Sequence, residues 1–132
     1  MLGVREPGIY GNSDFDTYLN KLRAAYPEVT IQFFQSNIEG EIVNAIQENG
    51  FSGDGIILNA GGYTHTSVAI ADAMAAIQKP VIEVHISNIY AREEYRRTSL
   101  LSARAAGTIG GMGLDVYEMA LIFLSKALKV RQ

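Results

Sequence analysis

The sequence contains no cysteine and only two histidines among its 132 residues. Without cysteine there can be no disulfide and no thiolate-bound metal, which fits a reducing compartment, and we expect a cytoplasmic protein. Two histidines alone make a weak case for a metal centre, so we expect none.

Long apolar runs and an excess of positive charge are missing as well. No stretch of about 18 apolar residues and no signal peptide occurs, so we predict a soluble protein that is not exported. The formal charge of −3, from 11 basic and 14 acidic residues, gives no basic surface that would attract nucleic acid. We therefore expect neither a membrane nor a polynucleotide partner.

The sequence does have enough apolar residues for one core. Its length suits one domain, and 48% hydrophobic content supports a core of ordinary size. We predict a single domain over residues 1–132. Residues 1–12 are rich in glycine and show no periodicity, which predicts a loop.

Apolar periodicity predicts alternating strands and helices along the rest of the chain. Strand-forming runs lie at 29–35, 55–59, 81–86 and 106–109. Helical spacing runs from a cap at Ser13 to about Tyr26, from about 42 to 49 or 50, from 68 to 77 and from 114 to 130; residues 91–97 look like a short charged helix or turn. This rhythm predicts a flavodoxin-like three-layer α/β/α fold with a parallel sheet.

Polar residues collect where two of these strands end. Asn59 ends one strand, His65 follows in the next loop, and His85 with Ser87 ends another. Ligands bind beyond the carboxyl ends of parallel strands, so we expect a site at this edge. Residues 60–62 lack the spacing of a phosphate-binding loop. Asn59 and His65 suit hydroxyl groups better, although a simple turn with an exposed histidine is the alternative.

Glu83 and His85 interrupt an otherwise apolar strand. They are two residues apart and so point to the same face, where burying both is costly unless they form a hydrogen bond. A carboxylate beside an imidazole fixes its tautomer and favours the charged ring, as a general acid requires. The alternative is a structural ion pair in the core. The backbone N–H groups of Ile86 and Ser87 offer a carboxylate site at the strand end.

Arginines follow this strand in the charged segment. Arg92, Arg96 and Arg97 have helical spacing to Glu93 and Glu94, and a solvated charged turn explains them without any ligand.

Three further residues have both a bland and a functional interpretation. Arg5 and Tyr10 are either ordinary loop residues or a pair in which the arginine favours the phenolate, a usable base. Asp72 lies in a predicted helix as an exposed carboxylate, and only an oligomer would give it a ligand.

Four blocks of the sequence, taken together, resemble the type II 3-dehydroquinate dehydratases. They are GVREPGIYG at 3–11, QSNIEG at 35–40, NAGGYTHTS at 59–67 and EVHISNIYAREEYR at 83–96. The resemblance implies a flavodoxin-like fold and a homo-dodecamer built as a tetramer of trimers. It also implies a cofactor-free and metal-free dehydration of 3-dehydroquinate to 3-dehydroshikimate, in the shikimate pathway of aromatic amino acid biosynthesis.

The resemblance assigns catalytic roles to four residues. Tyr10 would remove the proton at C2 of the substrate, and Arg5 would hold Tyr10 as phenolate and support the enolate. His85 would protonate the C1 hydroxyl as it leaves, with Glu83 orienting the imidazole ring.

The remaining roles concern binding. Asn59, His65 and Arg96 would bind substrate hydroxyls, and the N–H groups of Ile86 and Ser87 would bind the substrate carboxylate. Asp72 would reach in from a neighbouring subunit, and residues 1–12 would form a lid over the active site.

One feature departs from the family pattern. Members begin with an apolar central strand followed by Gly-Pro-Asn-Leu-Asn, and this sequence starts after that point. The first strand is therefore expected to be missing, with a gap in the sheet beside the strands at 29 and 55. The alternative to an enzyme is a non-catalytic flavodoxin-like module that binds a small anion or assembles with other subunits.

Overall fold

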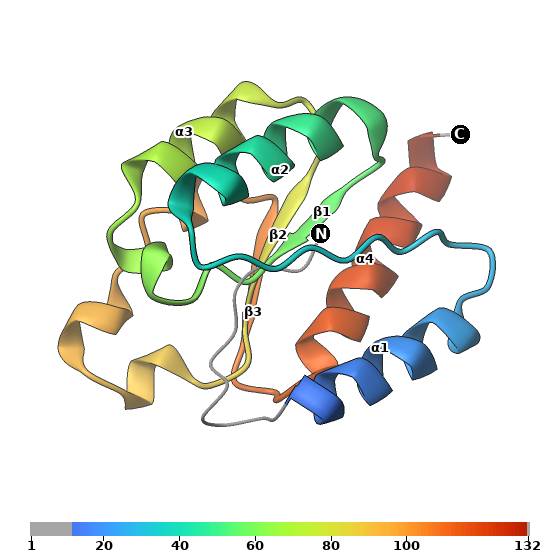
Figure 1. Cartoon of the computed structure of the whole chain (residues 1–132), viewed down its shortest axis with the longest axis horizontal. Helices are drawn as coiled ribbons and strands as arrows, with labels where there is room; N and C mark the ends of the chain where they lie inside the picture. The colour runs from blue at the N-terminus through green and yellow to red at the C-terminus, as the bar shows by residue number, and fades with distance from the viewer. Residues whose placement is uncertain (1–11, 132) are drawn as a thin grey trace.

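A three-stranded parallel sheet forms the centre of residues 12–131, the part of the chain that the computed structural model describes (Figure 1). The strands are β1 (Ile56–Leu58), β2 (Val81–His85) and β3 (Gly107–Gly110), in the order β1-β2-β3. The register pairs Ile56 with Val81 and Ile82 with Gly107. The predicted strands at 55–59, 81–86 and 106–109 are confirmed, with ends shifted by one or two residues.

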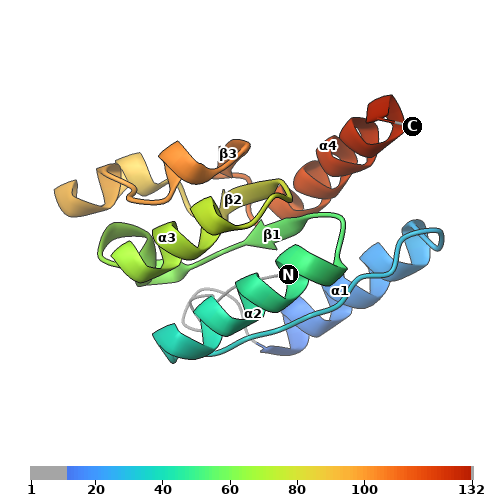
Figure 2. The ribbon, with the colours of Figure 1, turned by 90° about the horizontal axis from the view of Figure 1, so that it is seen from above.

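Within the described residues, four α-helices cover the two faces of this sheet (Figure 2). They are α1 (Asn12–Ala25), α2 (Glu39–Ser52), α3 (Val68–Ala76) and α4 (Asp115–Arg131). One core joins α1 and α4 to Ile57, Ile82 and Val84. The other joins α2 and α3 to the alternate strand residues Ile56, Leu58 and Val81. The alternation follows from the period of two along a strand, and it confirms the predicted α/β/α layers.

The predicted strand at 29–35 is wrong. The segment is extended but pairs with no strand among the described residues. Val29, Ile31 and Phe33 still pack on the α1–α4 core, and the rings of Phe33 and Phe15 lie 5.1 Å apart. The strand-like composition thus reflects side-chain burial, whereas a ladder also needs a neighbouring backbone within hydrogen-bond reach.

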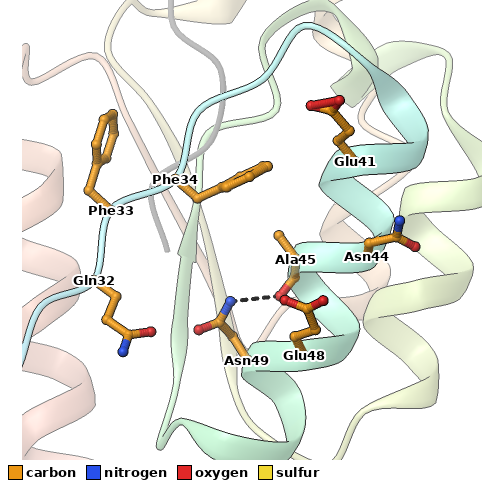
Figure 3. A pocket seen from close by; sticks show the side chains of 8 residues that line it. All are labelled: Gln32, Phe33, Phe34, Glu41, Asn44, Ala45, Glu48 and Asn49. Atoms are coloured by element: carbon orange, nitrogen blue, oxygen red, sulfur yellow. Dashed lines mark hydrogen bonds between the residues drawn. The ribbon is translucent and has the colours of Figure 1, made fainter.

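A pocket of about 360 Å³ opens between this extended segment and α2 (Figure 3). It is lined on one side by Gln32, Phe33 and Phe34, and on the other by Glu41, Asn44, Ala45, Glu48 and Asn49. None of the predicted site residues that fall within 12–131 lines it. Among the described residues, β1 pairs only with β2. The other edge of β1 therefore has no strand partner within residues 12–131.

Several local predictions need small corrections. Ser13 lies inside α1 instead of capping it, because the helix begins at Asn12. The second helix, predicted to end near Gly50, continues two residues further to Ser52. Ser67 caps α3 by accepting a hydrogen bond from the N–H of Ile70 at 3.0 Å.

Short 3₁₀ helices make up much of the polar loops. They are η1 (Gly61–His65), η2 (Ile89–Ala91), η3 (Glu94–Arg97) and η4 (Ser102–Arg104). The glycine turn predicted after β1 is therefore the start of η1. The charged segment after β2 forms η2 and η3. Within residues 12–131, no helix is both long and apolar enough to cross a membrane.

Candidate active site

Glu83 and His85 form a buried pair on β2. Their side chains share the face of the sheet that α2 and α3 cover, as their spacing predicts, and the residues are 1% and 8% exposed. Nε2 of His85 lies 2.5 Å from Oε2 of Glu83. Burial makes a hydrogen bond between the two groups favourable, because a buried polar group without a partner is costly.

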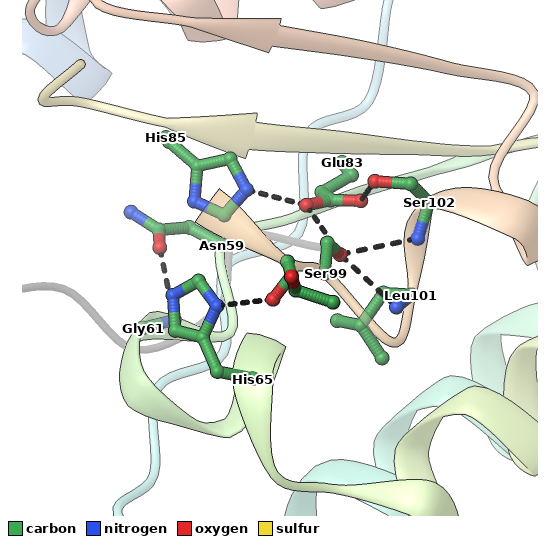
Figure 4. Close-up of polar contacts among 9 residues, drawn as sticks. Asn59, Gly61, His65, Glu83, His85, Ser99, Leu101 and Ser102 are labelled. Carbon is green, nitrogen blue, oxygen red and sulfur yellow. Dashed lines mark hydrogen bonds and ion pairs between the residues drawn. The ribbon is translucent and has the colours of Figure 1, made fainter. Parts of the chain in front are cut away.

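Two serines, which sequence reasoning missed, complete the contacts of Glu83 (Figure 4). Ser102 Oγ donates to Oε1 at 2.7 Å, and Ser99 Oγ donates to Oε2 at 2.9 Å. Neither serine lies near Glu83 in the sequence, and neither belongs to a periodic pattern. No sequence signal short of a known fold would have found them.

These contacts decide the charge state of Glu83. Burial alone would raise its pKa, but the hydrogen bonds from His85 and Ser102, the positive charge of His85 and the bond from Ser99 together hold the pKa below its usual 4.5. Glu83 is therefore a carboxylate near neutral pH. Because a carboxylate only accepts hydrogen bonds, Nε2 of His85 carries a hydrogen and donates it to Glu83.

Asn59 directly follows β1 and His65 ends η1, and both lie near the Glu83–His85 pair, the dyad (Figure 4). Asn59 comes close to the dyad because Leu58 pairs with Glu83 in the sheet. Asn59 is buried; its Nδ2 donates to the hydroxyl of Tyr117 at 3.0 Å, and its Oδ1 accepts from the N–H of Gly61. Nδ1 of His65 lies 2.7 Å from the carbonyl oxygen of Thr98 and so carries the hydrogen of that bond. Nε2 of His65 is then the atom that can accept from a ligand hydroxyl.

The arginines after β2 are arranged largely as the charged-turn interpretation predicts. Nε of Arg96 donates to Glu93 at 2.7 Å, with a spacing of three residues. Arg92 lies 3.9 Å from Glu93 and also approaches the hydroxyl of Ser87 at 3.4 Å. Arg97 is exposed.

The other predicted site residues fall into three groups. Ile86 and Ser87 directly follow β2 and are partly buried beside the dyad. Asp72 is exposed on α3, between buried neighbours that face the core. Arg5 and Tyr10 lie outside the described residues. Among residues 12–131, no group of three or more histidine, aspartate or glutamate side chains could hold a metal ion.

Comparison with known families assigns the chain to a family. The family model described as Dehydroquinase class II matches residues 1–125. The chain belongs to this family. The class II dehydroquinase match covers both halves of the dyad and every other predicted site residue.

Individual relatives agree with the family assignment. The 3-dehydroquinate dehydratase of Campylobacter jejuni strain 81-176 is 56% identical over 124 residues, which cover 92% of this chain and 78% of that protein. The enzyme of the same name from Nitratiruptor sp. is 47% identical over 140 residues, which cover 100% of this chain and 90% of that protein. The type II dehydroquinase of Butyrivibrio crossotus has a crystal structure that superposes with a TM-score of 0.84, at 39% identity over 94% of this chain and 95% of that one. The flavodoxin-like fold class is thereby confirmed.

Proposed function

We propose that this chain is a 3-dehydroquinate dehydratase of the shikimate pathway, which eliminates water from 3-dehydroquinate through an enolate and needs no cofactor. The observation that carries the proposal is the buried Glu83–His85 pair at the carboxyl end of β2, in a chain whose family match extends over residues 1–125. An imidazole held by a carboxylate at that edge of a parallel sheet is suited to acid catalysis on a bound ligand.

The chemistry needs a base and an acid on one substrate. The ketone acidifies the proton at C2, and Tyr10 as phenolate takes that proton, so the electron pair enters the enolate. When the enolate collapses, a C1–C2 double bond forms and the C1–O bond breaks. Hydroxide is a poor leaving group, so His85 supplies a proton and water departs. The proton gained by Tyr10 and the one lost by His85 are exchanged through solvent before the next turnover.

The contact within the pair supports Nδ1 of His85 as the atom that delivers the proton. Nε2–H of His85 is committed to the carboxylate of Glu83 at 2.5 Å. The proton that reaches the substrate is therefore the one on Nδ1. Glu83 stabilises the imidazolium and keeps the ring in one orientation, and it need not change protonation itself.

Substrate binding follows from the surrounding groups. Nε2 of His65 accepts from a hydroxyl, and the buried amide of Asn59 has a second N–H besides the one that it donates to Tyr117. Arg96 adds positive charge and donors beside the substrate hydroxyls, and the N–H groups of Ile86 and Ser87 bind the carboxylate.

The assembly is a further part of the proposal. A tetramer of trimers would bring Asp72, which is exposed on α3, to the site of a neighbouring subunit. Residues 1–12 would act as the lid, and the enzyme would work in the cytoplasm. Light scattering of the purified chain tests the assembly, and Asp72→Ala is expected to raise KM without loss of oligomer mass.

The experiment that tests the reaction follows the ultraviolet absorption of the enone in 3-dehydroshikimate. Loss of general acid catalysis in His85→Ala should lower kcat by about 10²–10⁴-fold, and Tyr10→Phe should abolish turnover. Ser52→Ala is the matched control, because the Ser52 hydroxyl donates to the backbone carbonyl of Glu48 in α2 and bonds to no proposed site residue among the described residues. No enone formation by the unaltered chain, or full activity in His85→Ala, would contradict the proposal.

A further inference from the structure

We infer that Ser99 and Ser102 are positioning residues of the catalytic pair, which hold Glu83 as a carboxylate in the one orientation that fixes the hydrogen on Nε2 of His85. The inference rests on the proposed function only for its effect on turnover. The hydrogen-bond arrangement itself is independent of what the substrate is.

The hydroxyl of Ser99 can point its hydrogen only at Glu83. Its oxygen accepts from the backbone N–H of Leu101 at 3.0 Å and from that of Ser102 at 3.1 Å. These two bonds use both lone pairs, so the single hydroxyl hydrogen is free to donate and meets Oε2 of Glu83 at 2.9 Å. Ser99 is therefore a donor of fixed direction.

With Ser102 added, three donors surround one carboxyl group. Oε1 accepts from Ser102, and Oε2 accepts from both Ser99 and His85. A proton on either oxygen would face a donor hydrogen and break one of these bonds. His85 is the titratable side chain in this set, and the other two donors are hydroxyls that keep their hydrogens at any working pH. Glu83 thus stays ionised through the cycle, and the exchangeable proton remains on Nδ1 of His85.

The segment that carries the serines is itself held firmly. Leu101 is fully buried in the α2–α3 core, and the N–H of Leu100 donates to the carbonyl of Thr64 at 2.9 Å. The carbonyl of Thr98 accepts from His65. Residues 98–102 therefore join the end of β2 to the loop after β1, and the hydroxyl positions are set by packing and not by Glu83 alone.

The test measures the ionisation of Glu83 directly, by carbon NMR of protein labelled at the glutamate carboxyl, with Glu83→Gln to assign the signal. Ser102→Ala and Ser99→Ala should each raise the pKa of Glu83, and the double variant should raise it further. The nitrogen spectrum of His85 should lose its fixed Nε2–H tautomer in the double variant. Ser102→Thr keeps a hydroxyl, so the pKa of Glu83 and the Nε2–H tautomer of His85 should both match those of the parent protein.

Turnover supplies the second readout. Each alanine variant should lower kcat about tenfold with little change in KM, and the acidic limb of the kcat profile should move to higher pH. Ser52→Ala should match the parent protein in every measurement. Ser102 is exposed, so Ser102→Ala and Ser102→Thr keep the test valid if Ser99→Ala, which also loses two backbone contacts, fails to fold.

The outcomes separate the two proposals. If the parent chain forms no enone but the alanine variants raise the pKa of Glu83, the proposed function fails and the serine arrangement stands. If the parent turns over and the double variant shows unchanged Glu83 titration and unchanged kcat, the inference about the serines is overturned.

Discussion

Glu83 shows how one residue can be buried and charged at the same time. Removing a carboxylate from water is costly, and at 1% exposure that cost is nearly complete. Three donors on its two oxygens outweigh the cost, so the net effect lowers the pKa instead of raising it. The same three contacts that make the charge tolerable also orient His85, so stability and chemistry depend on one set of bonds.

Acid unfolding should reveal this residue. Because the pKa of Glu83 is lower in the folded protein than in the unfolded chain, its ionised form stabilises the fold above the unfolded value near 4.5. That stabilisation should disappear as the pH falls from there through the folded pKa. In urea titrations, the stability gap between the parent and Glu83→Gln should therefore be present above pH 4.5 and should shrink as the pH falls below that value. A gap that does not change with pH would count against an ionised Glu83.

At the scale of elements, the sequence predicted correctly the strands that have both a strand-like side-chain pattern and a paired backbone. Glu83 and His85 could be placed together because two residues on one strand must share a face. The segment at 29–35 has the same strand-forming composition, yet composition encodes burial of side chains and not the presence of a neighbouring backbone. Ser99 and Ser102 were missed for a related reason, since only the folded chain brings them to Glu83.

Two glycines of α2 provide an element-scale prediction. A Cβ at Gly50 would lie 2.3 Å from Cγ2 of Ile77, which follows α3, whereas a Cβ at Gly40 would meet nothing within 4 Å. Alanine favours a helix over glycine by about 1 kcal/mol, but overpacking costs about 1–3 kcal/mol. Gly50→Ala should therefore lower the free energy of unfolding, and Gly40→Ala should raise it by about 0.5–1 kcal/mol.

Urea denaturation of the two single variants and of Gly50→Ala with Ile77→Ala measures the effect. The double variant should be more stable than the sum of its single changes, because the clash is removed with the isoleucine side chain. Equal stabilisation by Gly40→Ala and Gly50→Ala would show that α2 does not press on Ile77.

For the whole molecule, support for the sheet is uneven from one edge to the other. β2 is paired on both sides and carries the dyad, with one core on each of its faces. β1 is paired with β2, and the extended segment at 29–35 contributes side chains to a core but no ladder to the sheet. The site is therefore built on the best supported strand, and the least supported backbone lies beyond β1.

Hydrogen-exchange rates of the backbone amides should follow this difference in strand pairing. Backbone N–H groups of residues 30–35 have no backbone acceptor among the described residues, although Arg23 binds the carbonyl of Ile31 at 2.9 Å. Amides in β2 open only when the ladders on both sides break. Mass spectrometry of exchanged peptides should thus show rapid labelling over 30–35 and the slowest labelling over 81–85. Equal protection of the two segments would mean that another backbone pairs with residues 30–35 in solution, and the sheet would then extend beyond β1.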